Sequence, residues 1–166
     1  YVLKKFPDET APFHILDLGV GSGAIVLSIL AERPRAKGLA TDISDEALAV
    51  ARENAANLGL ANQIAFARGN WTEGLADASF DVVVSNPPYV PTAVMAGIPR
   101  EVADFEPTLA LNGGADGLDL FRPLAQWAAR ALKPGGVLAC ELYEGHMDSA
   151  RAVAEQAGFV DVHIVD

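Results

Sequence analysis

This chain of 166 residues has little cysteine, little histidine and few basic residues. The single cysteine, Cys140, excludes an internal disulfide, and its place in an apolar run predicts inert packing in a reducing compartment, the cytoplasm. The three histidines lie in separate predicted elements without metal-ligand spacing, so no metal site is expected. No apolar run approaches the roughly 20 residues of a membrane span, and the N-terminal residues show no signal-peptide pattern, so no membrane partner is expected.

The charge balance is acidic. Twelve Lys and Arg face 22 Asp and Glu, which gives a net charge of −10. Binding to a nucleic acid backbone needs clustered basic residues, so this balance argues against a nucleic acid partner, although a local basic patch stays open. Ordinary solubility explains the charge more simply.

Hydrophobic periodicity predicts alternating strands and helices. The length of 166 residues predicts one domain over residues 1–166, and an apolar fraction of 51% argues against a disordered chain. Strands are expected at residues 13–18, 37–41, 63–68, 80–85, 137–142 and 159–165. Helices are expected from the first glycine turn to Pro34, over 45–58 and 117–132, and in a segment that ends near residue 157. Residues 92–116 are expected to form a long loop, and residues 133–136 a turn. This alternation predicts an α/β fold, an open, mostly parallel Rossmann-like sheet with helices on both faces.

The segment Asn86-Pro87-Pro88-Tyr89 follows a β-branched strand at residues 81–85. Two consecutive prolines predict a stiff, extended loop at the carboxyl end of that strand, where open α/β sheets bind ligands. The Asn86 side-chain oxygen and the Pro87 carbonyl could each accept one N–H of a planar NH2 group, with the Tyr89 ring against its flat face. The competing interpretation is a surface turn that merely ends a strand.

A second pattern lies at the end of the first strand, where Asp17 precedes Gly19-Val20-Gly21-Ser22-Gly23. A strand, a glycine turn and a helix bring backbone N–H groups close to a ligand, although a tight structural turn remains an alternative. Asp42 ends the second strand and could accept both ribose hydroxyls of a nucleoside, because Ser44 is the better cap for the helix that follows. Trp71 after the third strand could cover a purine ring or pack in the core, and both interpretations stay open.

Together these motifs resemble class I S-adenosylmethionine-dependent amino-methyltransferases. A further stretch, Glu106-Pro107-Thr108-Leu109-Ala110-Leu111 followed by Gly113-Gly114 and Asp116-Gly117-Leu118, resembles the bacterial release-factor glutamine N5-methyltransferases. The resemblance runs from about residue 15 to the end of the chain. It implies methyl transfer from S-adenosylmethionine, with S-adenosylhomocysteine as product and no metal, to the N5 of a glutamine in a peptide chain release factor.

The resemblance also implies roles for individual residues. Gly19 to Gly23 (including Val20, Gly21 and Ser22) would lie along the methionine part of the cofactor, Asp42 at the ribose and Trp71 at the adenine. Asn86 would contact both cofactor and substrate. The catalytic set would be Asn86, Pro87 and Tyr89, and the substrate-binding set Asn86, Pro87, Pro88 and Tyr89.

Three departures accompany this resemblance. Asn70 stands where the family often has Asp, residues 142–146 differ from the usual continuation after Glu141, and the family's helical N-terminal domain is expected to be absent. The alternative acceptors are adenine N6 or guanine N2 in DNA or RNA. Two further alternatives are an NAD-dependent dehydrogenase, which the G-x-G-x-G spacing disfavours, and a non-catalytic binding module.

Overall fold

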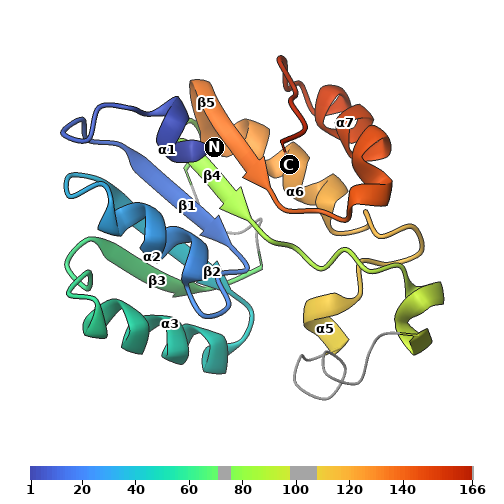
Figure 1. Ribbon diagram of the computed structural model, residues 1–166, viewed down its shortest axis with the longest axis horizontal. Coiled ribbons are helices and arrows are strands. Elements are labelled where there is room, and N and C mark those ends of the chain that lie inside the picture. Colours follow the sequence, from blue (N-terminus) through green and yellow to red (C-terminus); the bar gives the residue numbers. More distant parts are fainter. Residues whose placement is uncertain (71–75, 98–107, 166) are drawn as a thin grey trace. The chain divides into compact units, whose positions relative to one another are not determined.

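The computed structural model describes residues 1–70, 76–97 and 108–165 (Figure 1). The described chain falls into two compact units. Unit 1 comprises residues 1–86 and 130–140, and unit 2 comprises the described residues of 87–129 and 141–165. No helix among these residues is long and apolar enough to cross a membrane.

Unit 1 contains a five-stranded sheet in the order β3-β2-β1-β4-β5. The strands are β1 (His14–Leu18), β2 (Lys37–Asp42), β3 (Ile64–Arg68), β4 (Phe80–Ser85) and β5 (Leu132–Cys140). All four neighbouring pairs are parallel, so every strand ends at the same edge of the sheet (Figure 1). The predicted open, parallel Rossmann-like sheet with flanking helices is thereby confirmed.

The central strands β1 and β4 are buried along most of their length. Ile15, Leu16 and Leu18 in β1 are fully buried, and so are Val82 and Val83 in β4. Because successive side chains alternate between the faces of a strand, burial of consecutive residues means that both faces are covered. The continuous apolar runs in the sequence predicted this arrangement.

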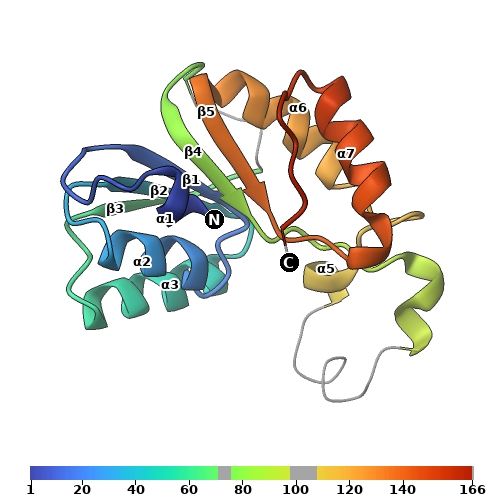
Figure 2. The same cartoon turned by 45° about the horizontal axis from the view of Figure 1, so that its top comes forward.

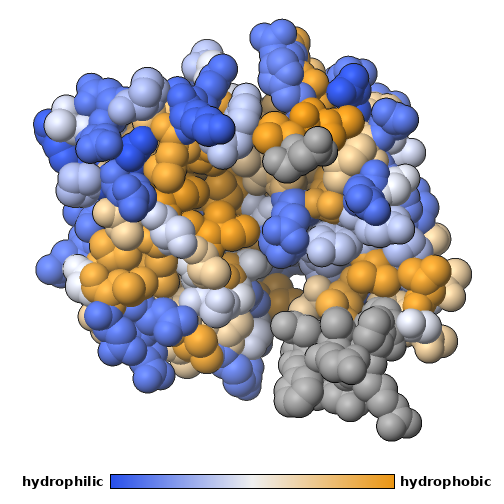
Figure 3. All heavy atoms as spheres, in the orientation of Figure 1, coloured by the Kyte–Doolittle hydropathy of each residue, from blue (hydrophilic) through white to orange (hydrophobic). Residues whose placement is uncertain are grey.

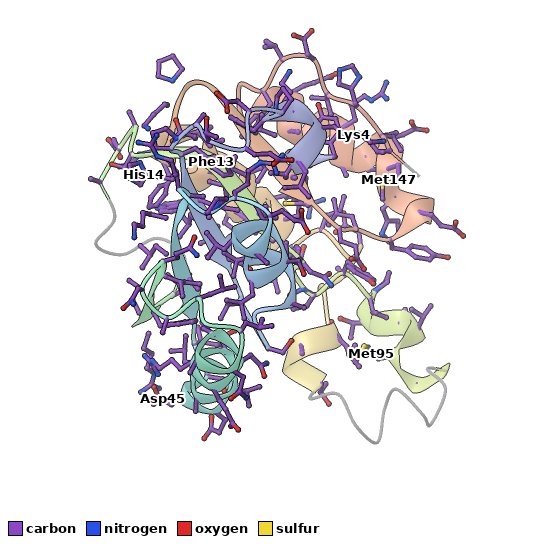
Figure 4. The ribbon with its side chains drawn as sticks, turned by 60° about the vertical axis from the view of Figure 1, so that its left-hand side comes forward. Lys4, Phe13, His14, Asp45, Met95 and Met147 are labelled. Atoms are coloured by element: carbon purple, nitrogen blue, oxygen red, sulfur yellow. The ribbon has the colours of Figure 1, made fainter. Side chains whose placement is uncertain are left out.

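Helices α2 (Ala24–Ala31) and α3 (Asp45–Asn57) lie side by side against one face of the sheet (Figure 2). The Ser44 hydroxyl caps α3 by accepting the Ala47 N–H at 3.1 Å, and Asp45 follows in the first turn (Figure 4). Helix α3 buries Leu48, Ala51 and Ala55, as its spacing predicts. The helix was predicted over residues 45–58, but α3 ends one residue earlier, and Leu58 is 59% exposed.

A short helix, α1 (Val2–Lys5), precedes β1 in a stretch for which the sequence predicted no element. Arg33, which is only 5% exposed, holds it by donating hydrogen bonds to the carbonyls of Leu3 and Phe6 at 3.0 Å. The rings of Phe6 and Phe13 stack at 5.2 Å between centroids, and Figure 4 labels Phe13 just before β1. The stretch before β1 is therefore anchored to unit 1 by both polar and apolar contacts.

Strand β5 differs from its prediction. The expected turn at 133–136 lies inside the strand, because Leu132 pairs with Phe80 and Val137 pairs with Val82. Four residues on β5 therefore face a single residue on β4, which makes an irregular bulge. Lys133 within it donates to both carboxylate oxygens of Asp81 at 2.9 Å.

Unit 2 is built from short helical elements. They are η1 (Thr92–Gly97), α5 (Thr108–Leu111), most of α6 (Phe121–Ala131), η2 (Glu144–His146) and α7 (Met147–Gln156). Helix α6 begins four residues later than predicted, because residues 113–119 form a turn of their own. Its apolar residues at helical spacing, Phe121, Leu124, Ala125 and Ala128, are buried. Figure 4 labels Met95 in η1 and Met147 at the start of α7.

The predicted final strand at residues 159–165 is wrong. The described part of this segment pairs with no strand, and Val160, Ile164 and Val165 are exposed. Alternating apolar residues favour a strand only where a neighbouring strand accepts its backbone hydrogen bonds. The alternating pattern of residues 159–165 is therefore compatible with a strand, but in the described part of the chain this segment does not pair.

Apolar side chains also reach the surface of unit 1. Figure 3 shows them on the face over α2 and α3, surrounded by hydrophilic side chains. Ile43, Val50 and Leu58 are the large exposed ones between β2 and the end of α3. Such scattered exposure is usual for a folded protein and marks no site by itself.

Candidate functional site

The glycine turn at residues 19–23 joins β1 to α2 at the carboxyl edge of the sheet. Its three glycines all have positive φ angles, from +53° at Gly21 to +87° at Gly23, which other residues rarely adopt. The Gly19 and Val20 amides donate to the Thr41 carbonyl at 2.9 and 3.0 Å, so the turn is fixed to the end of β2. Among the residues that the structure describes, no atom lies within 4 Å of the position that a methyl group would take at Gly21, so this face of the turn is open to that extent.

Asp42, the last residue of β2, is tied to this turn. Its Oδ2 accepts the Gly21 N–H at 3.0 Å and its Oδ1 accepts the Ser44 N–H at 2.9 Å. Ser44 is the cap of α3, as predicted, but Asp42 is also engaged by the backbone. Each carboxylate oxygen still has acceptor capacity for a further donor.

Asp17 is a functional candidate that the sequence reasoning left without a role. It lies within β1, is 1% exposed, and neither carboxyl oxygen has a hydrogen-bond partner among the described residues. Burial raises its pKa to about 7, and the nearby charge of Asp42 adds to this shift. An unpartnered carboxyl group next to a glycine turn is suited to meet a cationic ligand group. The signal for it in the sequence is an acidic residue inside an otherwise apolar strand.

The neighbouring thiol is not a nucleophile. Burial and the charge of Asp17 both raise the pKa of Cys140 far above its ordinary value. A reactive cysteine needs the opposite environment, one that favours the thiolate. The prediction that Cys140 packs inertly agrees with this environment.

Asn86 follows β4 at the same edge of unit 1. Ser85 pairs with Leu18 of β1, so Asn86 and Gly19 are the next residues along two adjacent strands. The Ser85 hydroxyl reinforces this junction by donating to the Leu18 carbonyl at 2.6 Å. Asn86 is exposed, whereas Pro87, the first residue of unit 2, is buried. The glycine turn, Asp42 and Asn86 therefore come together at one edge, as predicted.

The rest of the Asn-Pro-Pro-Tyr loop belongs to unit 2. The Tyr89 hydroxyl lies 3.5 Å from Oε1 of Glu141, and partial burial beside this carboxylate raises the Tyr89 pKa. Beyond Tyr89, the Val90 amide donates to the Leu111 carbonyl at 2.9 Å and the Gly113 amide donates back to the Val90 carbonyl at 2.8 Å. The loop is thus braced by the glycine-rich segment that follows α5.

Trp71 lies outside the described residues, as do Glu106 and Pro107. Its predicted place at a purine ring stays a prediction. Asn70, just before it, is exposed after the end of β3. The roles predicted for the other site residues toward cofactor and substrate stay predictions as well.

Comparison with known proteins places this geometry in context. Residues 1–98 match the family described as methyltransferase small domain. The chain is 54% identical over 164 residues to a protein of Caulobacter vibrioides named release factor glutamine methyltransferase, covering 99% of this chain and 56% of that protein. The chain therefore spans about half the length of the curated relatives that it matches.

Solved structures agree on the fold. A ribosomal protein L11 methylase from Lactobacillus delbrueckii subsp. bulgaricus superposes with a TM-score of 0.69 at 19% identity, covering 99% of this chain and 70% of that one. A methyltransferase from Thiobacillus denitrificans, solved in complex with S-adenosyl-L-homocysteine, superposes with a TM-score of 0.51 at 22% identity, covering 82% of this chain and 45% of that one. At these identities the likeness concerns the fold alone.

Proposed function

Because the chain belongs to the methyltransferase small domain family, we propose that it transfers a methyl group from S-adenosylmethionine to the side-chain N5 of a glutamine. The acceptor is a peptide chain release factor, as the name of the 54% identical relative suggests. The observation that carries the proposal is Asn86, which leaves β4 beside the glycine turn and begins the stiff Asn-Pro-Pro-Tyr loop. The reaction belongs in the cytoplasm, which the single inert cysteine supports.

The residues of unit 1 fit S-adenosylmethionine. The glycine turn offers an open backbone face at Gly21, and Asp42 has acceptor capacity left for ribose hydroxyls. Asp17 is a buried carboxyl group whose oxygens accept no hydrogen bond from the described residues, and a cationic amino group of the ligand would compensate its charge. Trp71 is proposed to cover the adenine. When bound, S-adenosylmethionine supplies an electrophilic methyl group on a sulfonium and leaves as S-adenosylhomocysteine.

The chemical difficulty lies in the acceptor. An amide nitrogen is a weak nucleophile because its lone pair is delocalised into the carbonyl group. We propose that the Asn86 side-chain oxygen and the Pro87 carbonyl each accept one N–H of the glutamine amide, with Pro88 and Tyr89 lining the loop. These acceptors favour the positive charge that develops on nitrogen as it bonds to the methyl carbon, and the extra proton then passes to water. No general base is needed before the transfer.

Methyl transfer from labelled S-adenosylmethionine tests the proposal. The chain is incubated with a release factor, with the same factor carrying Gln→Ala at the acceptor position, and with DNA and RNA. We expect label on the first substrate only, and mass spectrometry should place it on the glutamine side chain. Label on adenine or guanine, with none on the release factor, would instead support the nucleic acid alternative that the same loop leaves open.

A further inference from the structure

Two glycines in unit 2 have no room for a side chain because the Asn-Pro-Pro-Tyr loop occupies it. A methyl group at Gly113 would stand 2.6 Å from the Tyr89 Cα and 2.8 Å from the Pro88 carbonyl oxygen. At Gly117, whose φ is +77°, a methyl group would collide with the Tyr89 carbonyl oxygen and stand 2.9 Å from the His146 ring. Contacts this short are essentially absent between real side chains and backbone, so both positions require glycine.

Hydrogen bonds hold the same two segments together. Besides the paired contacts of Val90 with Leu111 and Gly113, the Thr92 amide donates to the Gly114 carbonyl at 2.8 Å. Asn112 adds a side-chain link, since its Oδ1 accepts the Thr92 hydroxyl at 2.8 Å and the Gly114 amide at 3.0 Å. The loop and the glycine segment are therefore joined by an isolated parallel β-bridge between Val90 and Asn112, with further hydrogen bonds beside it.

Tyr89 is restrained from three sides. Its Cα faces Gly113, its carbonyl oxygen faces Gly117, and its hydroxyl lies 3.5 Å from Glu141. The two prolines before it already limit the backbone torsions of the loop. Few degrees of freedom remain by which residues 87–89 could turn.

We propose that Gly113 and Gly117 are positioning residues for methyl transfer. By packing without a side chain against Pro88 and Tyr89, they set the direction in which the Pro87 carbonyl and the Tyr89 ring face the acceptor amide. This inference rests on the proposed function of the loop, but the packing that it invokes is measurable without any reaction. Loss of alignment alone can cost about 100-fold in rate, so small shifts of the loop should be felt in turnover.

Matched alanine variants separate alignment from backbone strain. Gly117→Ala is compared with Gly135→Ala, because Gly135 has a similar φ of +80° but no atom of the described residues within 4 Å of the new methyl group. Gly113→Ala is compared with Gly97→Ala, whose new methyl group also meets no described atom within 4 Å. We expect both test variants to lower kcat by about 10- to 100-fold while the Kd for S-adenosylmethionine changes by less than about twofold. Both controls should keep the parent turnover.

A variant without added bulk guards against misfolding of the glycine variants. Asn112→Ala removes the acceptor for Thr92 and Gly114, and Asn112→Asp restores an oxygen at that place. We expect about a 3- to 10-fold lower kcat for the alanine variant and recovery in the aspartate variant. Parent-like kcat in Gly113→Ala, Gly117→Ala and Asn112→Ala would overturn the proposal.

Hydrogen exchange distinguishes failure of this inference from failure of the proposed function. The Val90 amide, bonded to Leu111, should exchange slowly in the parent chain and faster in Gly113→Ala and Gly117→Ala. If the parent chain methylates no glutamine, the proposed function fails, and the exchange result still decides whether the two glycines hold the loop. Unchanged exchange at Val90 would sink the positioning role even in an active enzyme.

Discussion

The two glycine-rich segments of this chain use the same residue for opposite purposes. In the turn at residues 19–23, a methyl group at Gly21 would meet no atom within 4 Å, so the missing side chain leaves open space. In the segment at residues 113–117, methyl groups at Gly113 and Gly117 would strike the loop at Pro88 and Tyr89, so the missing side chains admit protein. The contrast concerns Gly21, where the turn has room for a ligand, and Gly113 and Gly117, where protein already fills the space; Gly23 at the end of the turn is also filled, by Leu27.

This contrast predicts how each segment responds to substitution. An open glycine can acquire a methyl group without a steric collision, so beyond the backbone strain of its positive φ the effect of the substitution appears only when the ligand binds. At a filled glycine, any added atom displaces the neighbouring residue even without ligand, because packed interiors have little free space. Glycine-rich sequence alone indicates neither case, and only the surroundings decide.

The largest effect is expected at Asn86, where unit 1 passes into unit 2. Asn86→Ala should lower kcat by on the order of 10²-fold or more, since it removes an acceptor for the amide that carries developing charge. Cofactor affinity, measured by calorimetry, should change little. An active Asn86→Ala variant would remove the basis for treating the loop as the acceptor site.

Asp17 sharpens the contrast from the open side. Its pKa is raised from 3.8 to about 7, so between these values the folded chain holds a proton that the unfolded chain has released. The contribution of Asp17 to the free energy of unfolding without ligand should therefore fall as pH rises from about 4 to 7. In denaturant titrations, the Asp17→Asn variant should lack this decrease.

Cofactor binding should show the reverse trend. Ionised Asp17 attracts a cationic ligand group, so the affinity for S-adenosylmethionine should increase between pH 5.5 and 7. Asp17→Asn should bind about 10- to 100-fold more weakly at pH 7, the range for a lost charge-assisted contact. Parallel pH profiles for the two proteins, measured by calorimetry, would contradict a contact between Asp17 and the ligand.

Gly21 gives a smaller, cleaner comparison. Gly21→Ala places a methyl group at φ +53° in open space, and Gly59→Ala does the same at φ +73° far along the chain in the loop after α3. Both should lose about 1 kcal/mol of stability from the left-handed backbone. Only Gly21→Ala should weaken cofactor binding, by about 10-fold. Equal cofactor affinity in the two variants would show that the open face of the turn receives no ligand.

The smallest effect concerns the charges that flank the filled segment. Arg122 donates to both Asp116 and Asp119, and the guanidinium lowers the Asp116 pKa to about 2. Because this pKa is lowered from 3.8, the stabilisation is present above about pH 4 and is lost as pH falls toward 2. Asp116→Asn should lower the Tm slightly at pH 7, as expected for an exposed pair, and by less at pH 2, where about half of the carboxyl groups are protonated. A difference in Tm that is undiminished at pH 2 would point to a cause other than the charge.

Much of unit 1 was predictable because its strands are buried on both faces. A continuous apolar run such as residues 82–84 can lie only in a covered strand, and the residue after such a run in a parallel sheet must lie at the carboxyl edge. Asn86 and the glycine turn therefore followed from local sequence. Asp17 did not, because its importance depends on burial and on a missing partner.

Unit 2 was less predictable because its order depends on contacts between segments. The bridge between Val90 and Asn112 joins residues 22 positions apart, and hydrophobic periodicity does not predict such a contact. The strand predicted at residues 159–165 was wrong for a related reason: the alternating pattern indicates a strand, but these residues pair with no strand of the described sheet. The bulge in β5 replaced an expected turn because Pro134, Gly135 and Gly136 bend a strand without ending it.

That bulge has a consequence for how copies of this protein behave at high concentration. β5 is an edge strand of the described sheet, and an edge strand can pair with a strand from another molecule. Proline at 134 offers no N–H, the bulge interrupts the spacing of the remaining donors, and Lys133 adds a charge beside them. The first half of β5 is therefore poorly suited to pair with a strand of another molecule, which is how exposed edge strands start aggregation.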